Sequence, residues 1–160
     1  MIELSEIFKT SRKFLGDTFK PYRNSDEDFA SALSSFISYL KANHPDHMLD
    51  DNFQISDNFT KPFERSNSTV YSLGDMIFIN DPMDIYSCSV AGTSNSTEPD
   101  FIANFVTDNT TGWTKWHVPG SIDGNAVIHY ITWFCLIMDT DEQANEAKAL
   151  FHEQKYKELL

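Results

Sequence analysis

The first third of the chain carries hydrophobic residues at the spacing of amphipathic helices. In the opening segment they share one helical face that cannot continue through Pro21; they are Leu4, Ile7, Phe8, Phe14, Leu15 and Phe19. We therefore predict a helix over residues 2–19. Ser25 followed by Asp28 has the pattern of a capping box, and the apolar residues after it again follow helical spacing. A second helix is predicted over residues 25–43.

From about residue 53 the hydrophobic period changes to that of β-strands. Short runs rich in β-branched and aromatic residues are separated by Gly, Asn, Asp and Pro. Runs 69–73 and 76–80 flank Gly74 and Asp75, a two-residue link whose leading glycine suits a type II′ hairpin. Further strands are predicted at residues 86–91, 101–106 and 114–118. The polar stretch between the first two of these, GTSNSTEP, predicts a loop rather than a domain linker, because it is too short to separate two domains.

The segment 127–138 is mainly apolar on both of its alternating faces. A strand covered on each side shows this pattern, so we predict a long central strand here. Thr140 with Gln143 predicts the cap of a last helix packed on the sheet through Ala144, Ala147, Leu150, Phe151 and Tyr156. Two N-terminal helices, a mainly antiparallel sheet of about five to seven strands and a C-terminal helix make an α+β fold.

Length and composition predict one folded domain. A chain of 160 residues with 41% hydrophobic residues has enough apolar bulk for one core, so we predict a single globular domain over residues 1–160. Glu3 and Glu6 stand where a secretory signal needs a basic start. The longest apolar stretch, 127–138, is shorter than the roughly 20 residues of a membrane helix. We expect a soluble, cytoplasmic protein with no membrane contact.

The charge of the chain is unevenly distributed along the sequence. There are 12 basic and 24 acidic residues, which gives a net charge of −12. Fourteen of the acidic residues but only three basic ones lie between residues 24 and 110, so this segment carries −11 and the remainder −1. Such a field repels nucleic acid phosphate and attracts cationic surfaces. With only three arginines in the chain, the sequence disfavours a nucleic-acid-binding protein.

The chain contains no motif for catalysis or for a cofactor. The dinucleotide, P-loop, nucleophile-elbow and C-x-x-C patterns are all missing from the sequence, so we predict no catalytic residue and no cofactor. His44 and His47 suggest a metal site, but Pro45 breaks the helix that would place both on one face, and no metal is predicted. Cys88 and Cys135 are expected to be buried, reduced thiols.

The stretch DDNFQISDNFT mixes acidic and aromatic residues and contains no cation. Either it is a loop with its phenylalanines turned inward, or it belongs to a contact site in which aromatics provide affinity and acids steer the approach. Trp113 and Trp116 are three apart, so on one strand they face opposite ways and one is exposed, as at an interface. The predicted partner-binding residues are Asp50, Asp51, Phe53, Asp57, Phe59, Asp81, Asp84, Trp113 and Trp116.

These observations favour an acidic protein-binding module without enzymatic activity. Its concrete form is an inhibitor or immunity-type antidote that neutralises a basic protein partner such as a toxin nuclease. One alternative is a small-molecule-binding or enzymatic α+β domain with a pocket lined by His129, Tyr130, Trp133 and Trp116. Another is a structural subunit whose aromatic surface forms an oligomer. The sequence leaves these three open.

Overall fold

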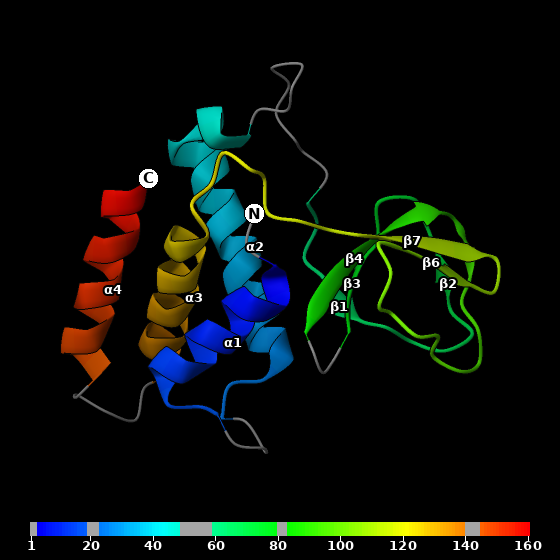
Figure 1. Ribbon diagram of the computed structural model, residues 1–160, viewed down its shortest axis with the longest axis horizontal. Helices are drawn as coiled ribbons and strands as arrows, with labels where there is room; N and C mark the ends of the chain where they lie inside the picture. Colours follow the sequence, from blue (N-terminus) through cyan, green and yellow to red (C-terminus); the bar gives the residue numbers. More distant parts are fainter. Residues whose placement is uncertain (1–2, 19–22, 49–58, 80–82, 140–144) are drawn as a thin grey trace. The chain divides into compact units, whose positions relative to one another are not determined.

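The protein divides into two compact units, which we describe separately on a computed structural model (Figure 1). The structure describes residues 3–18, 23–48, 59–79, 83–139 and 145–160. The helical unit comprises Met1–Asp57 with Val118–Leu160, and the β unit comprises Asn58–His117. Helices and strands are thus segregated along the chain, and the predicted α+β fold is confirmed. The prediction of one domain over 1–160 stays a prediction, because compactness does not say whether the units unfold together.

The helical unit contains four α-helices and one 3-10 helix among its described residues. They are α1 (Leu4–Leu15), α2 (Asp26–Asn43), η1 (Pro45–Met48), α3 (Gly124–Met138) and α4 (Asn145–Leu159). The predicted capping box of α2 is confirmed, since the Asp28 N–H donates to the Ser25 hydroxyl and the Ser25 N–H to the Asp28 carboxylate. Helix α1 ends earlier than expected because Gly16 adopts a left-handed conformation, with φ 68°, that closes the helix.

The predicted central strand over 127–138 is wrong, because these residues form helix α3. Helix α3 packs against α1, α2 and α4, so side chains all around it are buried. A helix covered on every side is apolar on every side, which imitates a strand covered on both faces. Asp123, whose side chain accepts from the Asn125 N–H, provides its N-cap.

The last helix is confirmed, but its packing differs from the prediction. The predicted cap at residues 140–144 lies outside the described residues. The buried residues of α4 are Asn145, Ala149, His152 and Tyr156, and the helix packs against α3. Three residues expected to lie against the sheet, Ala147, Leu150 and Phe151, are exposed instead. Among the described residues, no helix is long and apolar enough to cross a bilayer.

The β unit contains a mixed five-stranded sheet and a two-stranded sheet. Its strands are β1 (Phe63–Glu64), β2 (Val70–Tyr71), β3 (Met76–Ile79), β4 (Asp84–Val90), β5 (Gly92–Thr93), β6 (Phe105–Asp108) and β7 (Thr111–Lys115). The larger sheet has the order β1-β3-β4-β7-β6, with only the β1–β3 pair parallel, and β2 pairs with β5. The predicted hairpin across Gly74 and Asp75 is wrong, because β2 and β3 belong to different sheets.

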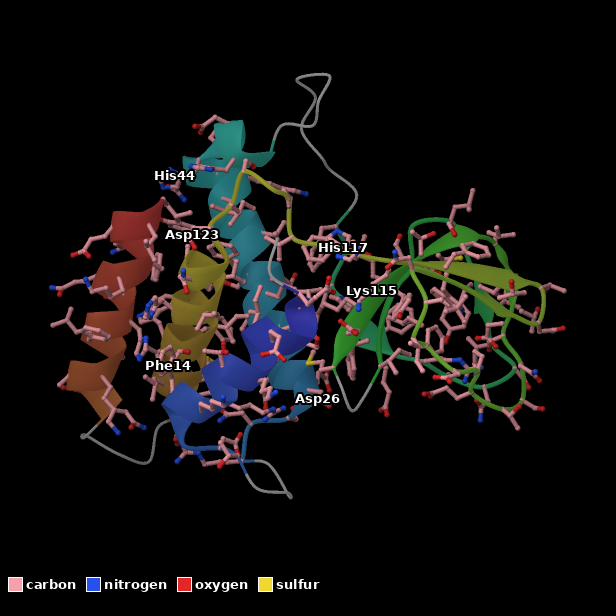
Figure 2. The ribbon with its side chains drawn as sticks, in the orientation of Figure 1. Phe14, Asp26, His44, Lys115, His117 and Asp123 are labelled. Atoms are coloured by element: carbon pink, nitrogen blue, oxygen red, sulfur yellow. The ribbon has the colours of Figure 1, made fainter. Side chains whose placement is uncertain are left out.

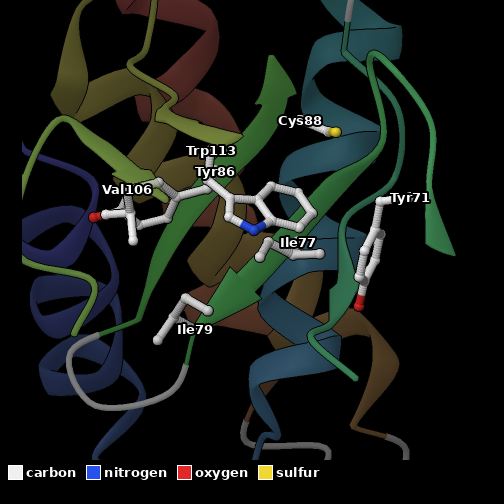
Figure 3. Close-up of a cluster of buried hydrophobic side chains, with 7 residues drawn as sticks. All are labelled: Tyr71, Ile77, Ile79, Tyr86, Cys88, Val106 and Trp113. Carbon is white, nitrogen blue, oxygen red and sulfur yellow. The ribbon is translucent and has the colours of Figure 1, made fainter. Parts of the chain in front are cut away.

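One face of the larger sheet carries the core of the β unit (Figure 3). Trp113 lies at its centre and packs edge-on against Tyr71 with ring centroids 4.8 Å apart. The cluster contains Tyr71, Ile77, Ile79, Tyr86, Cys88, Val106 and Trp113. Because β2 and β5 pair with each other and Tyr71 of β2 lies in this cluster, the small sheet covers part of the core face.

Candidate protein-binding surface

The structure locates four of the nine predicted partner-binding residues. Asp50, Asp51, Phe53, Asp57 and Asp81 lie outside the described residues, so their role stays a prediction. Phe59 and Trp116 pack against each other with ring centroids 4.8 Å apart, and both are partly buried. They therefore form an aromatic pair within the β unit. Because Phe53 lies outside the described residues, both interpretations of the DDNFQISDNFT stretch stay open.

Asp84 and Trp113 are buried and serve the structure of the β unit. Trp113 is fully buried in the core. Asp84 forms an ion pair with Lys115, labelled in Figure 2, at 2.9 Å. Neither side chain is accessible to a partner while the unit is folded, so a contact surface on this unit consists of other residues.

The acidic middle of the chain is divided between the two units. The β unit has seven acidic and three basic residues, a net charge of −4, which leaves −8 for the helical unit. Asp26 of the helical unit pairs with Arg12, and in the β unit Asp84 pairs with Lys115 and Asp108 with Arg65. Some of the acidic residues of the middle segment therefore serve in ion pairs within the fold. The same pairs withdraw two of the three cations of the β unit from its surface, so its exposed charge is mainly carboxylate.

The Arg65–Asp108 pair is the most deeply buried of these interactions. The guanidinium donates from Nε to one carboxylate oxygen at 2.8 Å and from Nη2 to the other at 2.9 Å, in bidentate geometry. The Asn95 N–H and the Trp113 indole also donate to this carboxylate. Burial would raise the pKa of Asp108, but the bonds from Arg65, Asn95 and Trp113 hold that pKa below its ordinary value. The pair thus ties the 65–67 and 95–97 segments to the end of β6.

A turn just before β6 is held rigidly by a tyrosine from the core. The Tyr86 hydroxyl lies 2.9 Å from the Phe101 carbonyl and 3.2 Å from the Ala103 carbonyl, and both contacts have hydrogen-bond geometry. The Phe101 ring packs on the Tyr86 ring, and the Lys115 N–H donates to the carbonyl of Asn104 at 2.7 Å. These contacts fix the turn on both sides of residue 102.

The anchored turn presents apolar side chains to solvent. Ile102 is 79% exposed although its neighbours are fixed, and Phe105 at the start of β6 is 52% exposed. Val90 is 48% exposed, and both Val90 and Phe105 reach over Gly112, where an added Cβ would lie 2.8 Å from Val90 and 3.0 Å from Phe105. An exposed apolar group on a preorganised segment costs little ordering entropy when a partner covers it.

Two exposed carboxylates precede this turn. Glu98 and Asp100 are exposed, and neither forms an ion pair within the part of the chain that the structure describes. We call Glu98, Asp100, Ile102 and Phe105, together with Val90, the acidic–apolar surface. Sequence analysis placed 101–106 in one strand and so missed it. Glu98, Pro99 and Asp100 separate the strands and indicate a turn near this position. The exposure of Ile102, in contrast, depends on the distant Tyr86 hydroxyl.

The residues of the alternative pocket do not form one cluster within a unit. His129, Tyr130 and Trp133 lie on helix α3, whereas Trp116 belongs to the β unit. The Tyr130 ring is buried between Phe36 of α2 and Tyr156 of α4, with centroids 4.9 Å and 5.0 Å away. Tyr130 therefore packs the helical core.

His129 of α3 instead forms a hydrogen-bonded pair with His152 of α4. Their Nδ1 atoms are 2.7 Å apart, so one ring must donate and the other accept. Phe14, labelled in Figure 2, stacks on the His129 ring at 5.7 Å. Burial, followed by the neighbouring His129, lowers the pKa of His152 to about 4, and burial, followed by Lys155, lowers that of His129. The neutral pair therefore joins α3 to α4.

We expect the helical unit to lose stability as the pH falls from 7 to 5. The unfolded chain binds a proton at His152 below about pH 6.5, whereas the folded chain resists it down to about 4, so protons favour unfolding in this interval. The expected loss from His152 is about 1–2 kcal/mol in the free energy of unfolding. Urea denaturation of the unchanged protein and of His152→Gln at both pH values separates this contribution from that of the carboxylates. Only the unchanged protein has the His152 ring. Equal pH dependence in the two proteins would contradict it.

Cysteine and metal chemistry receive no support from the described residues. Cys88 and Cys135 are buried free thiols, and burial raises the pKa of Cys135 to about 12. The two ring nitrogens of His47 lie 3.1 Å from the Ser121 carbonyl and 3.2 Å from the Leu160 carbonyl, and a neutral ring can donate to only one of these oxygens. Across the described ranges, no group of three or more His, Cys, Asp or Glu side chains converges.

Comparison with protein-family models, with curated proteins and with solved structures gives no match.

Proposed function

We propose that this protein is an acidic protein-binding module that neutralises a basic partner, as an inhibitor or an immunity-type antidote to a toxin such as a nuclease. The single observation that carries the proposal is the acidic–apolar surface, in which a rigid turn exposes Ile102 beside unpaired carboxylates. Apolar groups at the centre of a contact provide affinity, and surrounding charges steer the approach and select the partner.

The distribution of cations supports the choice of a basic partner. Arg65 and Lys115 are largely buried in ion pairs with Asp108 and Asp84, so they do not neutralise the exposed carboxylates of the β unit. Arg12 is likewise buried in the helical unit, which leaves Arg23 as the one exposed arginine of the chain. A surface of this kind repels a phosphate backbone and suits a cationic protein surface that itself binds nucleic acid.

We expect the double variant Glu98→Lys/Asp100→Lys to bind basic partners at least about tenfold more slowly than the unchanged protein. The partners are obtained by selection on the immobilised protein from displayed libraries of linear peptides and of folded domains. Association rates of the selected binders, measured at low and high salt, give the result. The selected binders should be enriched in Lys and Arg, and the difference between the two proteins should shrink as salt screens the charges.

A matched control changes the net charge equally at another place. Asp46→Lys/Glu146→Lys alters two exposed carboxylates of the helical unit and should leave association within about twofold. If both double variants slow association equally, the effect belongs to net charge and not to the acidic–apolar surface. Binders without an excess of basic residues would refute the proposed class of partner.

A further inference from the structure

Strand β6 forms one edge of the five-stranded sheet. It pairs with β7 on one side, and no described strand pairs with its other side. The opposite edge strand, β1, contributes only Phe63 and Glu64 to the ladder, so it offers a shorter edge. An open strand edge presents unpaired N–H and C=O groups on which another chain can add a strand.

The register of the hairpin identifies which backbone groups of β6 face outward. Asn109 and Thr110 form a two-residue link between β6 and β7, and the Lys115 N–H donates to the Asn104 carbonyl. Hydrogen-bonded pairs alternate along an antiparallel ladder, so the residues at 104, 106 and 108 bond to β7. The N–H and C=O groups of Phe105 and Thr107 therefore point away from β7, and both residues are exposed.

We propose that the basic partner binds by adding an extended strand to the free edge of β6. This inference rests on the proposed function and specifies how the acidic–apolar surface is used. The outward groups of Phe105 and Thr107 supply four backbone hydrogen bonds, two as donors and two as acceptors. The exposed Phe105 ring and Ile102 give apolar contacts beside the edge, and Glu98 and Asp100 favour lysine or arginine in the added strand.

Charge decides against a second copy of this chain as the occupant. Two copies paired edge to edge would bring together β units of −4 each, on chains of −12 each. A strand that carries lysine or arginine instead gains from the same field. The partner is therefore a foreign chain with a basic, extended segment.

The sharpest test replaces one outward N–H without touching the ladder to β7. Proline is tolerated on an edge strand where the N–H faces solvent, so Thr107→Pro removes the donor and keeps every internal bond. The probe is a linear basic peptide of about ten residues, selected on the unchanged protein from the displayed peptide library. We expect the Kd of this peptide to rise at least about tenfold in Thr107→Pro. Thr107→Val, which keeps the N–H, should change it less than about twofold.

A second measurement uses unchanged protein and therefore does not depend on how Thr107→Pro folds. N-methylation of the peptide at alternate residues should abolish binding in one register and be tolerated in the other, as for a strand in a ladder. Tolerance at every position, or equal affinities for Thr107→Pro and Thr107→Val, would overturn the edge inference. If the edge inference fails in this way but Glu98→Lys/Asp100→Lys still slows the association of the selected basic binders, the proposed function stands. If only folded domains and no linear peptides are selected, the edge inference alone fails.

Discussion

Asp108→Ala is expected to lower the free energy of unfolding of the β unit by about 3–5 kcal/mol, because it leaves a buried guanidinium without its counter-ion. The Arg65 side chain is 2% exposed, and the remaining contacts from its guanidinium go to neutral oxygens of Asn67, Asn95 and Thr97. The substitution also removes the acceptor for the Trp113 indole. Since a small domain is stable by only about 5–15 kcal/mol, the loss removes a large fraction of the total stability.

Urea denaturation followed through the backbone NMR signals of the β unit measures this loss. Asp100→Ala is the matched control, because it removes an exposed carboxylate from the same unit and should change stability by less than about 0.5 kcal/mol. Asp108→Ala combined with Arg65→Met removes both charges and should recover part of the stability. A loss below about 1 kcal/mol for Asp108→Ala alone would show that the Arg65–Asp108 pair does not hold the 65–67 and 95–97 segments to the end of β6.

The helices at the start of the chain were predictable because their signals are local. Ser25 and Asp28 are three residues apart, and their reciprocal hydrogen bonds form within one turn whatever the rest of the fold does. The early end of α1 also has a local signal, since Gly16 can adopt the left-handed conformation that stops a helix. Pro21 also stops a helix, but α1 has already ended at Gly16.

The hydrophobic pattern of helix α3 does not by itself distinguish a fully buried helix from a fully buried strand. Length does carry information, since a mainly apolar run of twelve residues exceeds the common strand of about 5–6. Asp123, in front of the apolar run, is also a helix N-cap residue. These two local facts together favour the helix, whereas the many β-branched residues of the segment favoured the strand.

The acidic–apolar surface depends on contacts between residues far apart in the sequence. Ile102 is exposed because the hydroxyl of Tyr86 holds the carbonyls on either side of it, a contact across 15 to 17 residues. Likewise, Arg65 does not count as surface charge because Asp108, 43 residues later, binds it. The proposed class of partner rests on net charge, which the sequence states directly, whereas the contacting residues depend on contacts that only the fold shows.

Arg12→Ala is expected to destabilise the helical unit by about 3–5 kcal/mol, because one buried guanidinium joins three parts of the chain there. Arg12 lies 3.1 Å from Asp17 and 2.6 Å from Asp26, and it donates to the Asn24 carbonyl at 2.8 Å. It also lies over the Phe29 ring, 4.3 Å from the centroid. Its removal leaves the Asp17 carboxylate buried between α1 and α2 without a cation.

Lys9→Ala provides a control on the same helix. Lys9 pairs with Glu6 in solvent, with both side chains more than 60% exposed, so its removal should cost less than about 0.5 kcal/mol. Arg12→Lys keeps the charge but loses the fork that reaches two carboxylates and a carbonyl at once, so its stability should fall between the unchanged protein and Arg12→Ala. Thermal and urea unfolding followed by far-ultraviolet circular dichroism gives the order of the three variants. Equal losses for Lys9→Ala and Arg12→Ala would mean that the buried guanidinium does not hold α1 to the start of α2. Burial of the apolar faces of the two helices would then hold them together without it.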